Sequence, residues 1–420
     1  MRSGLSVADA QRTVLGAAEV LPAETVAADR AEGRVLAEAV VSTRTLPPAD
    51  NSAMDGWAVR AADLAVARDG APVALRIAFE VAAGGVASRA LATGEAARIF
   101  TGAPIPPDAD TIVRQEDAER DGDRVRVAFA PARGSHVRPA GEDVRTGDRV
   151  LDAGAVLSPA ALGLLVSLGR SVVSVRQRPR VALLSSGDEL VEPDTEPSGG
   201  RIVSSNSYTL AAQCRLAGAE PVYLGIARDT PVALEERLRA GLRADVLVSS
   251  AGVSVGDRDY VRPVLEKLGC TLLFWGVEMK PGYPLVFGRF GEEGPLVFGL
   301  PGNPVSAMVT FEQFVRPLLR KLSGHTALFR PTVRATLLHP LEKSAGRAHF
   351  VRVHLERRGG RDGEIVARTT GTQSSGALRS MALAQGLLVF PAEATLLRAG
   401  ESAIVQVLDD GFFAATESGF

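Results

Sequence analysis

Residues 179–323 alternate short apolar runs with amphipathic segments, and this rhythm constrains the fold more than any other feature of the sequence. Runs such as RVALL and DVLVSS are each followed by a segment whose apolar residues have helical spacing. A chain that alternates strand and helix in this way forms a mainly parallel sheet covered by helices on both faces. The pattern therefore predicts an α/β domain.

Four of the predicted strands run directly into loops of small and acidic residues. In an open parallel sheet, ligands bind outside the carboxyl ends of the strands, so we expect these loops to form a site. The loops are 185–189 (SSGDE), 228–230 (RDT), 249–259 (SSAGVSVGDRD) and 301–304 (PGNP).

The residue types in these loops suit a phosphorylated ligand and a metal ion. Glycine and serine loops expose backbone N–H groups that cradle phosphate, and carboxylates are the hard oxygen ligands that Mg²⁺ prefers. The candidate metal ligands are Asp188, Glu189, Asp229 and Asp259. A plainer interpretation is that Asp188 or Asp229 caps a helix and that the prolines and glycines only shape turns. Spacing alone thus predicts an α/β enzyme that binds a phosphate ligand, and it defines neither the substrate nor the reaction.

The remaining segments differ in pattern. Residues 5–40 have helical spacing: Ser6 is placed to cap a first helix, and Thr25 to Leu36 suggest a second. Residues 46–140 contain short alternating runs broken by proline, glycine and aspartate, which indicate a small β-domain. The tail, 330–420, predicts a small β-barrel or sandwich.

Composition excludes several classes of protein. The chain has 420 residues, enough for about three compact units. Its net charge of −2 gives no reason to expect nucleic acid as a partner. Cys214 and Cys270 are isolated in sequence and suggest neither a zinc site nor a disulfide framework. No apolar stretch approaches the roughly 20 residues of a membrane span, and the first residues do not resemble a signal peptide. We therefore expect a soluble, cytoplasmic protein with no membrane contact.

The motifs, in their order, closely resemble the molybdopterin molybdenumtransferase family, which includes the C-terminal domain of gephyrin. The α/β region carries SSGDEL, SNSY, SSAGVSVGDRDY, MKPG and LPGNPVSA. The resemblance extends upstream through PPADNSAMDGWAVR, IFTGAPIPPDADTIVRQED and RPAGEDVRTGD, and downstream through GRAHFVR and QSSGALRSMA. It covers nearly the whole chain.

The resemblance implies a multidomain α/β plus β fold and a homodimer. The implied parts are a discontinuous helical dimerisation domain (1–45 and 143–177), an inserted small β-domain (46–142), a mainly parallel α/β molybdopterin-binding domain (178–325) and a C-terminal β-barrel (326–420). It also implies the reaction, in which adenylylated molybdopterin and molybdate yield molybdenum cofactor and AMP with Mg²⁺ required. Possible partners are a molybdopterin adenylyltransferase and the molybdoenzymes that receive the cofactor.

Family positions carry over to this sequence residue by residue. Asp188, Glu189, Asp229 and Asp259 match positions tied to metal binding or activity, with Glu189 or Asp188 available as a general base. Lys280 resembles an anion-binding lysine. The positions implied to bind substrate are Asp55, Thr101, Asp143, Gly252, Ser254, Gly256, Pro301, Gly302, Asn303, Pro304, Arg352 and Ser375. The attacking group, water or a molybdate oxygen, stays open.

Three positions depart from the family pattern. Ala251 stands where glycine is usual, Tyr283 where a second lysine is usual, and Gly276 where some members have a basic residue. Losing a charge-assisted contact costs about 1.5–3 kcal/mol of anion binding. Two alternatives therefore remain beside the transferase: a non-catalytic cofactor carrier or scaffold, and a paralogue that prefers tungstate. A third, an enzyme that adenylates molybdopterin, would need only the α/β domain, and residues 1–175 argue against it.

Overall fold

The computed structural model describes residues 2–251, 260–359 and 363–414, which form two compact units. The larger unit comprises residues 1–26, 33–37 and 174–420, and the smaller one residues 27–32 and 38–173. Gly252, Ser254, Gly256 and Asp259, all expected at the site, lie outside the described residues.

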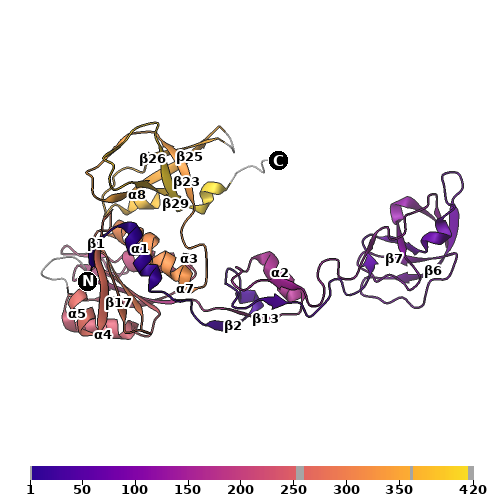
Figure 1. The fold of residues 1–420 in the computed structure, drawn as a ribbon, viewed down its shortest axis with the longest axis horizontal. Helices are drawn as coiled ribbons and strands as arrows, with labels where there is room; N and C mark the ends of the chain where they lie inside the picture. Colours follow the sequence, from indigo (N-terminus) through magenta and orange to yellow (C-terminus); the bar gives the residue numbers. More distant parts are fainter. Residues whose placement is uncertain (1, 252–259, 360–362, 415–420) are drawn as a thin grey trace. The chain divides into compact units, whose positions relative to one another are not determined.

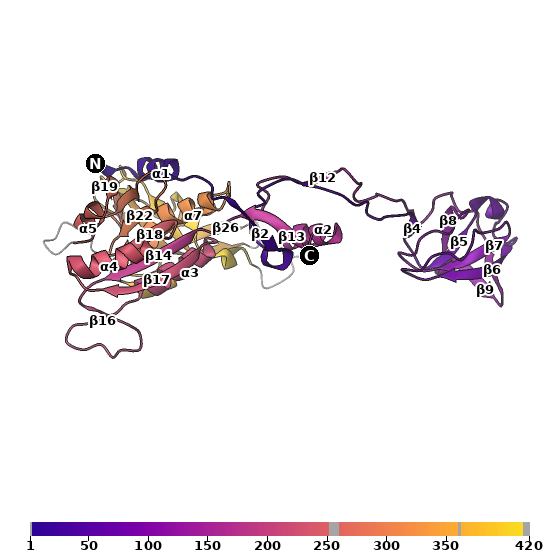
Figure 2. The ribbon, with the colours of Figure 1, turned by 90° about the horizontal axis from the view of Figure 1, so that it is seen from below.

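A seven-stranded sheet forms the centre of the larger unit (Figure 2). Four neighbouring strands are parallel, and the one strand antiparallel to its neighbours is β21. The predicted mainly parallel α/β domain is thus confirmed. In spatial order the strands are β1 (Arg2–Leu5), β19 (Cys270–Val277), β21 (Val286–Phe290), β22 (Leu296–Leu300), β18 (Val246–Ser250), β14 (Arg180–Ser186) and β17 (Glu220–Ala227).

Helices cover both faces of this sheet (Figure 1). On one face lie α4 (Pro231–Gly241) and α5 (Val261–Lys267). On the other lie α1 (Val7–Gly16), α3 (Asn206–Leu216) and a continuous run of α6 (Pro304–Thr310), the π-helix η4 (Phe311–Val315) and α7 (Arg316–Leu322). Strands such as β18 are buried on both faces, which explains why their sequences are continuous apolar runs.

The C-terminal region is a closed five-stranded barrel, so the barrel, one of the two forms expected, is confirmed. Closure follows from the pairing of β25 with both β26 and β27. The barrel strands are β23 (Thr332–Leu337), β25 (Ala348–Arg358), β26 (Glu364–Thr369), β27 (Gly386–Phe390) and β29 (Ser402–Val407), with α8 (Leu378–Ala382) beside them. Phe350 and Leu387 of the barrel and Met381 of α8 share one core with the helices of the α/β region.

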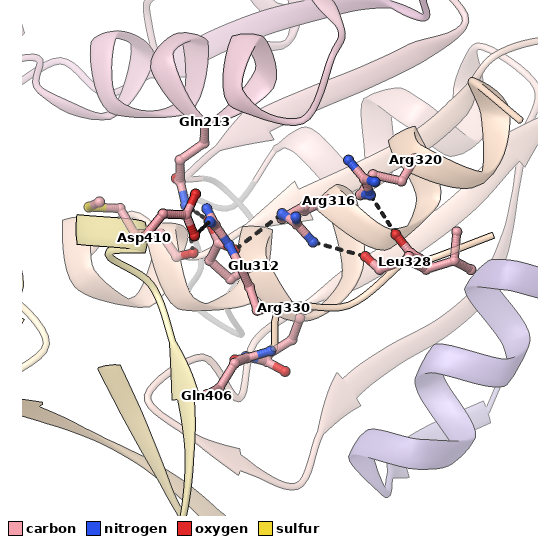
Figure 3. A network of polar contacts seen from close by, with 11 residues as sticks. Gln213, Glu312, Arg316, Arg320, Leu328, Arg330, Gln406 and Asp410 are labelled. Atoms are coloured by element: carbon pink, nitrogen blue, oxygen red, sulfur yellow. Dashed lines mark hydrogen bonds and ion pairs between the residues drawn. The ribbon is translucent and has the colours of Figure 1, made fainter. Parts of the chain in front are cut away.

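A buried polar network also ties the barrel to those helices (Figure 3). Glu312 in η4 accepts hydrogen bonds from Gln213 of α3 and from Arg330, which precedes β23. Gln313, the next residue in η4, donates to Gln406 of β29 at 2.6 Å. Since each polar group is buried, these bonds restrict how the two layers pack.

The smaller unit contains a six-stranded sheet, as expected for a β-domain in this stretch. Its strands, in spatial order, are β8 (Thr111–Arg114), β5 (Gly56–Val59), β7 (Glu95–Ile99), β6 (Val73–Val81), β10 (Arg124–Val127) and β9 (Ala118–Asp121). Smaller pairs are β4 (Asn51–Ser52) with β11 (Val137–Arg138) and β3 (Val40–Val41) with β12 (Arg149–Leu151). The unit's one α-helix among the described residues is α2 (Pro159–Ser167).

The first 40 residues differ from what their spacing predicts. The first helix is α1, and the side chain of Ser6 caps it as expected. The second predicted helix is wrong: β2 (Ala23–Ala27) is a strand that pairs with β13 (Val172–Arg176). Moreover, β1 and α1 belong to the unit of the seven-stranded sheet, where β1 pairs with β19, whereas we expected them in a helical domain with 143–177.

Candidate functional site

Four parallel strands, β22, β18, β14 and β17, end side by side at one edge of the seven-stranded sheet. Their register is aligned: Ser185 pairs with Ser250, which pairs with Leu300, and Ser186 pairs with Ala227. The four loops that the sequence singled out therefore leave the sheet together. The expectation that these four strand ends lie at one edge of the sheet is confirmed.

Asp188 and Asp229 meet across two of these loops. The amide of Asp229 donates to Asp188 Oδ1 at 3.3 Å. Neither aspartate caps a helix, because α4 is capped by the side chain of Thr230 and the turn after Gly187 leads into the short strand β15 (Leu190–Val191). The plainer interpretation of these two carboxylates thus fails.

Glu189 shares the turn with Asp188. A Cβ atom at Gly187, where φ is +151°, would lie 2.5 Å from Glu189 Oε2, so a side chain at this position would displace the exposed carboxylate of Glu189. Asp188 and Glu189 are exposed and Asp229 is half-buried. The described residues contain no cluster of three metal-ligating side chains.

Buried hydroxyl and amide groups lie behind these carboxylates. Ser185 and Ser250 are 3.3 Å apart at Oγ, and the amide of Asn206 donates to the carbonyl of Gly302 at 2.8 Å. Ser186 Oγ and Asn206 Oδ1 are buried without a hydrogen-bond partner among the described residues. A buried polar atom without a hydrogen bond destabilises the folded state unless a ligand or a water molecule bonds to it. These two atoms are therefore available to hydrogen-bond a ligand.

The loop 301–304 reaches from this edge toward the barrel. Pro301 is buried, Gly302 and Asn303 are exposed, and Pro304 begins α6. The next amide, of Val305, donates to the carbonyl of Ser375 at 3.0 Å.

A pocket of about 510 Å³ opens next to Ser375, and we call it the Lys280 pocket. It forms where β20 (Met279–Lys280) pairs with the start of β25, so that Lys280 lies beside His349. Burial, together with the charges of Lys280, Lys343 and Arg352, lowers the pKa of His349 to about 4. The pocket is lined by Met279, Lys280, Pro281, Gly282, Tyr283, Pro284, Ser306, Arg347, Gln373, Ser374 and Ser375.

Arg352 lies beneath this pocket and does not line it. Its side chain is 1% exposed and donates to Gln373 and to the carbonyls of Thr372 and Ser374 at 3.0–3.2 Å. Burial lowers the pKa of its guanidinium. Arg352 thus holds the loop that carries Ser375.

In the smaller unit, the structure brings Asp55 and Thr101 together. The amide and the hydroxyl of Thr101 both donate to Asp55 Oδ1 at 2.7 Å. These two bonds, the backbone one first, lower the pKa of the Asp55 carboxyl. Asp143 is exposed in a turn in which its amide donates to the carbonyl of Leu46.

Comparison with known proteins identifies the family of this chain. The chain matches the models of the MoeA N-terminal region (domain I and II) over residues 5–169, the probable molybdopterin binding domain over 182–321 and the MoeA C-terminal region (domain IV) over 334–408. It is 39% identical to a molybdopterin molybdenumtransferase of Nostoc sp., over 89% of this chain and 86% of that protein. The chain belongs to the molybdopterin molybdenumtransferase family.

Other members of the molybdopterin molybdenumtransferase family agree. The Haemophilus influenzae protein of that name is 35% identical, over 90% of this chain and 91% of its own. A crystal structure of the molybdopterin biosynthesis moea protein from Pyrococcus horikoshii has a TM-score of 0.81 and 30% identity, and covers 97% of this chain and 99% of that one. Membership in this transferase family makes the chain an enzyme.

Four residues of the site were missed by the sequence argument: Ser186, Asn206, Arg347 and Gln373. All four stand inside motifs that carry the family resemblance, namely SSGDEL, SNSY, GRAHFVR and QSSGALRSMA. The motifs were a sufficient signal for the site, but only the structure separates their buried from their exposed members.

Among the described residues, no helix is long and apolar enough to cross a membrane.

Proposed function

We propose that this chain transfers molybdenum from molybdate to adenylylated molybdopterin, releases AMP and depends on Mg²⁺. The observation that carries the proposal is the edge at which Asp188 and Asp229 meet in front of buried serine and asparagine groups. A carboxylate pair suits a metal that neutralises phosphate, and the groups behind it suit hydrogen bonding to a bound phosphate ester.

Carboxylates are the ligands that Mg²⁺ prefers, and Asp188 and Asp229 carry theirs on two adjacent loops that meet at this edge. Glu189, in the turn of Asp188, and Asp259, outside the described residues, are the further ligands that we propose, since the described residues alone form no cluster of three. When bound, Mg²⁺ would neutralise charge on the phosphate oxygens and favour attack at phosphorus.

Proton transfer and substrate binding are carried out by side chains and loops of the protein. Glu189 or Asp188 acts as general base toward the attacking group, which is water or a molybdate oxygen. Lys280 binds the oxyanion as a point charge, with Ser375 beside it. Gly252, Ser254 and Gly256 hold the phosphate of the pterin, and Pro301, Gly302, Asn303 and Pro304 shape the adjoining wall.

We further propose a homodimer in a cytoplasmic setting. In this arrangement Asp55, Thr101 and Asp143 of one subunit contribute to the site of the other. A molybdopterin adenylyltransferase would supply the substrate, and molybdoenzymes would receive the product.

The decisive experiment is AMP release from adenylylated molybdopterin with Mg²⁺ and either molybdate or tungstate. Wild type is compared with Glu189→Ala, and Glu196→Gln in the exposed loop that follows β15 is the control. We expect metal-dependent release that Glu189→Ala abolishes and the control retains. Tight binding of the pterin without release under either oxyanion would contradict the transferase and leave a carrier. Faster release with tungstate would identify a tungstate-preferring paralogue.

A further inference from the structure

A second pocket, of about 570 Å³, lies at the barrel and contains none of the residues assigned above to substrate or metal. We call it the His354 pocket. It is bounded by β25, by the end of β26 and by the two ends of the segment 370–385 that joins β26 to β27. Its volume is within the usual range of sites for small molecules.

The segment that joins β26 to β27 lines two pockets. Its middle, 373–375, lines the Lys280 pocket, and its two ends, 370–371 and 382–385, line the His354 pocket. A ligand in the His354 pocket would therefore contact the same stretch of chain that forms a wall of the Lys280 pocket.

Three polar side chains are neighbours in the His354 pocket. His354 faces out of the barrel, because Val353 and Leu355 on either side of it face the barrel core. On the β26 side, Arg368 is its partner in the strand register. On the β27 side, Gln385 donates its amide to the carbonyl of Val353 and accepts from the amide of Leu355 through Oε1, both at 3.0 Å. His354 is thus flanked by Arg368 and Gln385.

These three side chains have donors to spare. Within the part of the chain that the structure describes, the side chains of His354 and Arg368 form no hydrogen bond or ion pair. Gln385 uses its Oε1 toward Leu355, which leaves its NH₂ group with two donors. A guanidinium, an imidazole and a primary amide that converge on one pocket suit a carboxylate or a phosphate group.

Asp409 restricts which anions fit the pocket. Its Oδ1 accepts from the amide of Gly411 at 2.9 Å and so caps η5 (Asp410–Phe413), which leaves Oδ2 as an acceptor at the pocket. A hydroxyl group on the ligand can donate to this oxygen, whereas an ammonium group would be repelled by Arg368. Leu383, which is 57% exposed, offers an apolar contact to a carbon skeleton. The lining therefore favours a small organic anion that also carries a hydroxyl group.

We propose that the His354 pocket is a second ligand site, which binds a small hydroxylated organic anion. Arg368, His354 and Gln385 hold the carboxylate or phosphate group of this ligand, and Asp409 accepts a hydrogen bond from its hydroxyl group. Binding at this site requires no transferase activity, so it can be measured whether or not the proposed function holds.

The test is calorimetry on the full chain, without Mg²⁺, with two probes that differ in the anionic group. Citrate presents carboxylates and a hydroxyl group, and glycerol 3-phosphate presents a phosphate and hydroxyl groups. The tighter of the two identifies the anionic group that the pocket prefers. Tricarballylate and propyl phosphate are the matched analogues without hydroxyl groups.

The variants separate this pocket from the Lys280 pocket. Arg368→Gln removes the cation, and Gln385→Glu keeps an oxygen for the amide of Leu355 while replacing the NH₂ donor by an acceptor. Lys280→Gln removes the cation of the other pocket. Arg334→Gln, at an exposed arginine of β23 outside the His354 pocket, is the matched control. Thermal unfolding of each variant verifies that it folds.

We expect at least one probe to bind, and Arg368→Gln and Gln385→Glu each to weaken its binding about tenfold or more. Lys280→Gln and Arg334→Gln should leave its affinity unchanged. The analogue without hydroxyl groups should bind several-fold more weakly than its parent, and Asp409→Asn should reduce that difference.

Hydrogen exchange verifies where the probe binds. With the tighter probe bound, exchange should slow at 370–371 and 382–385, the two ends of the segment that line the pocket.

Absence of binding of both probes to wild type up to about 10 mM would overturn the proposal. Wild-type affinity in folded Arg368→Gln and Gln385→Glu would overturn it too, as would binding that Lys280→Gln abolishes and Arg368→Gln retains, since the anion would then lie in the Lys280 pocket. Equal affinity for each probe and its analogue would refute the hydrogen bond to Asp409 and with it the proposed class of ligand.

Discussion

Arg330 Nε donates to Glu312 Oε2 at 3.1 Å, and this bond joins the segment that enters the barrel to the π-helix of the α/β region. The two side chains are 10% and 4% exposed. Arg316 lies 3.8 Å from the same carboxylate, and burial lowers the pKa of its guanidinium to about 10. One buried carboxylate thus compensates two buried arginines (Figure 3).

Replacing Glu312 by Gln should therefore destabilise the protein strongly. Two buried positive charges would lose their counter-charge, which costs about 3–5 kcal/mol of unfolding free energy. Denaturant unfolding measures the loss, and Glu266→Gln, which breaks the exposed pair with Arg262, should cost less than about 1 kcal/mol. Equal losses in the two variants would show that burial of the network contributes nothing.

His349 should make stability depend on pH. It is 7% exposed, and its pKa of about 4 lies below that of an exposed histidine, about 6.5. Between these two pKa values the histidine is protonated in the unfolded chain and neutral in the folded chain. The stability that the neutral histidine contributes is therefore fully present above pH 6.5 and is lost as the pH falls toward 4. We expect a loss on the order of 2 kcal/mol from this group between pH 7.5 and 5. His349→Leu should have a flatter profile, while His325, whose pKa burial also lowers to about 4, keeps part of the slope. Parallel profiles would contradict the assignment.

Ala251 has a backbone conformation that favours glycine. Its φ is +80°, in the left-handed region, at the end of β18. Ala251→Gly should raise the unfolding free energy by about 0.5–1 kcal/mol, since relief of the strain exceeds the entropy cost of glycine. Ala227→Gly, at the end of β17 in the same sheet, should instead lower it by a similar amount. A loss for both variants would mean that the strain at Ala251 is negligible.

Arg352 should act on the site through the loop beneath which it lies. Arg352→Leu leaves the carbonyls of Thr372 and Ser374 without their donor, which should cost about 3 kcal/mol or more. Hydrogen exchange at residues 372–377 should accelerate, and the KM for molybdate should rise because Ser375 is no longer held. Arg334→Leu, an exposed arginine on β23, is the control and should change stability by about 0.5 kcal/mol at most. Unchanged exchange in the loop would exclude the positioning role.

The sequence predicted the α/β region well because its signals are local. Strands buried on both faces are continuous apolar runs, and parallel order alone brings their carboxyl ends together, so Asp188 and Asp229 could be paired without coordinates. The segment around Thr25 failed because an alanine-rich run has weak preferences, and pairing of β2 with β13 overrode them.

The Lys280 pocket could not be predicted in the same way. It depends on the pairing of β20 with β25, two strands 67 residues apart, and on which arginine of GRAHFVR faces outward. Family resemblance pointed to Arg352, whose side chain the structure buries, whereas Arg347 faces the pocket. Periodicity does not distinguish these two arginines, because their exposure is set by contacts with Tyr283 and with the loop 372–377.

The carboxylates of Asp188 and Asp229 lead to a prediction about magnesium itself. Asp188→Asn and Asp229→Asn each replace a charged oxygen ligand by a neutral amide while nearly preserving shape, so the concentration of Mg²⁺ needed for half-maximal AMP release should rise at least about tenfold. Saturating Mg²⁺ should recover much of the rate in each single variant, since only one ligand is weakened, and much less in the double variant. Chelation with EDTA should stop release by wild type, and added Mg²⁺ should restore it. Glu196→Gln, in the exposed loop that follows β15, should have the wild-type requirement. AMP release that survives chelation, or a Mg²⁺ requirement that neither aspartate affects, would show that these carboxylates do not hold the metal.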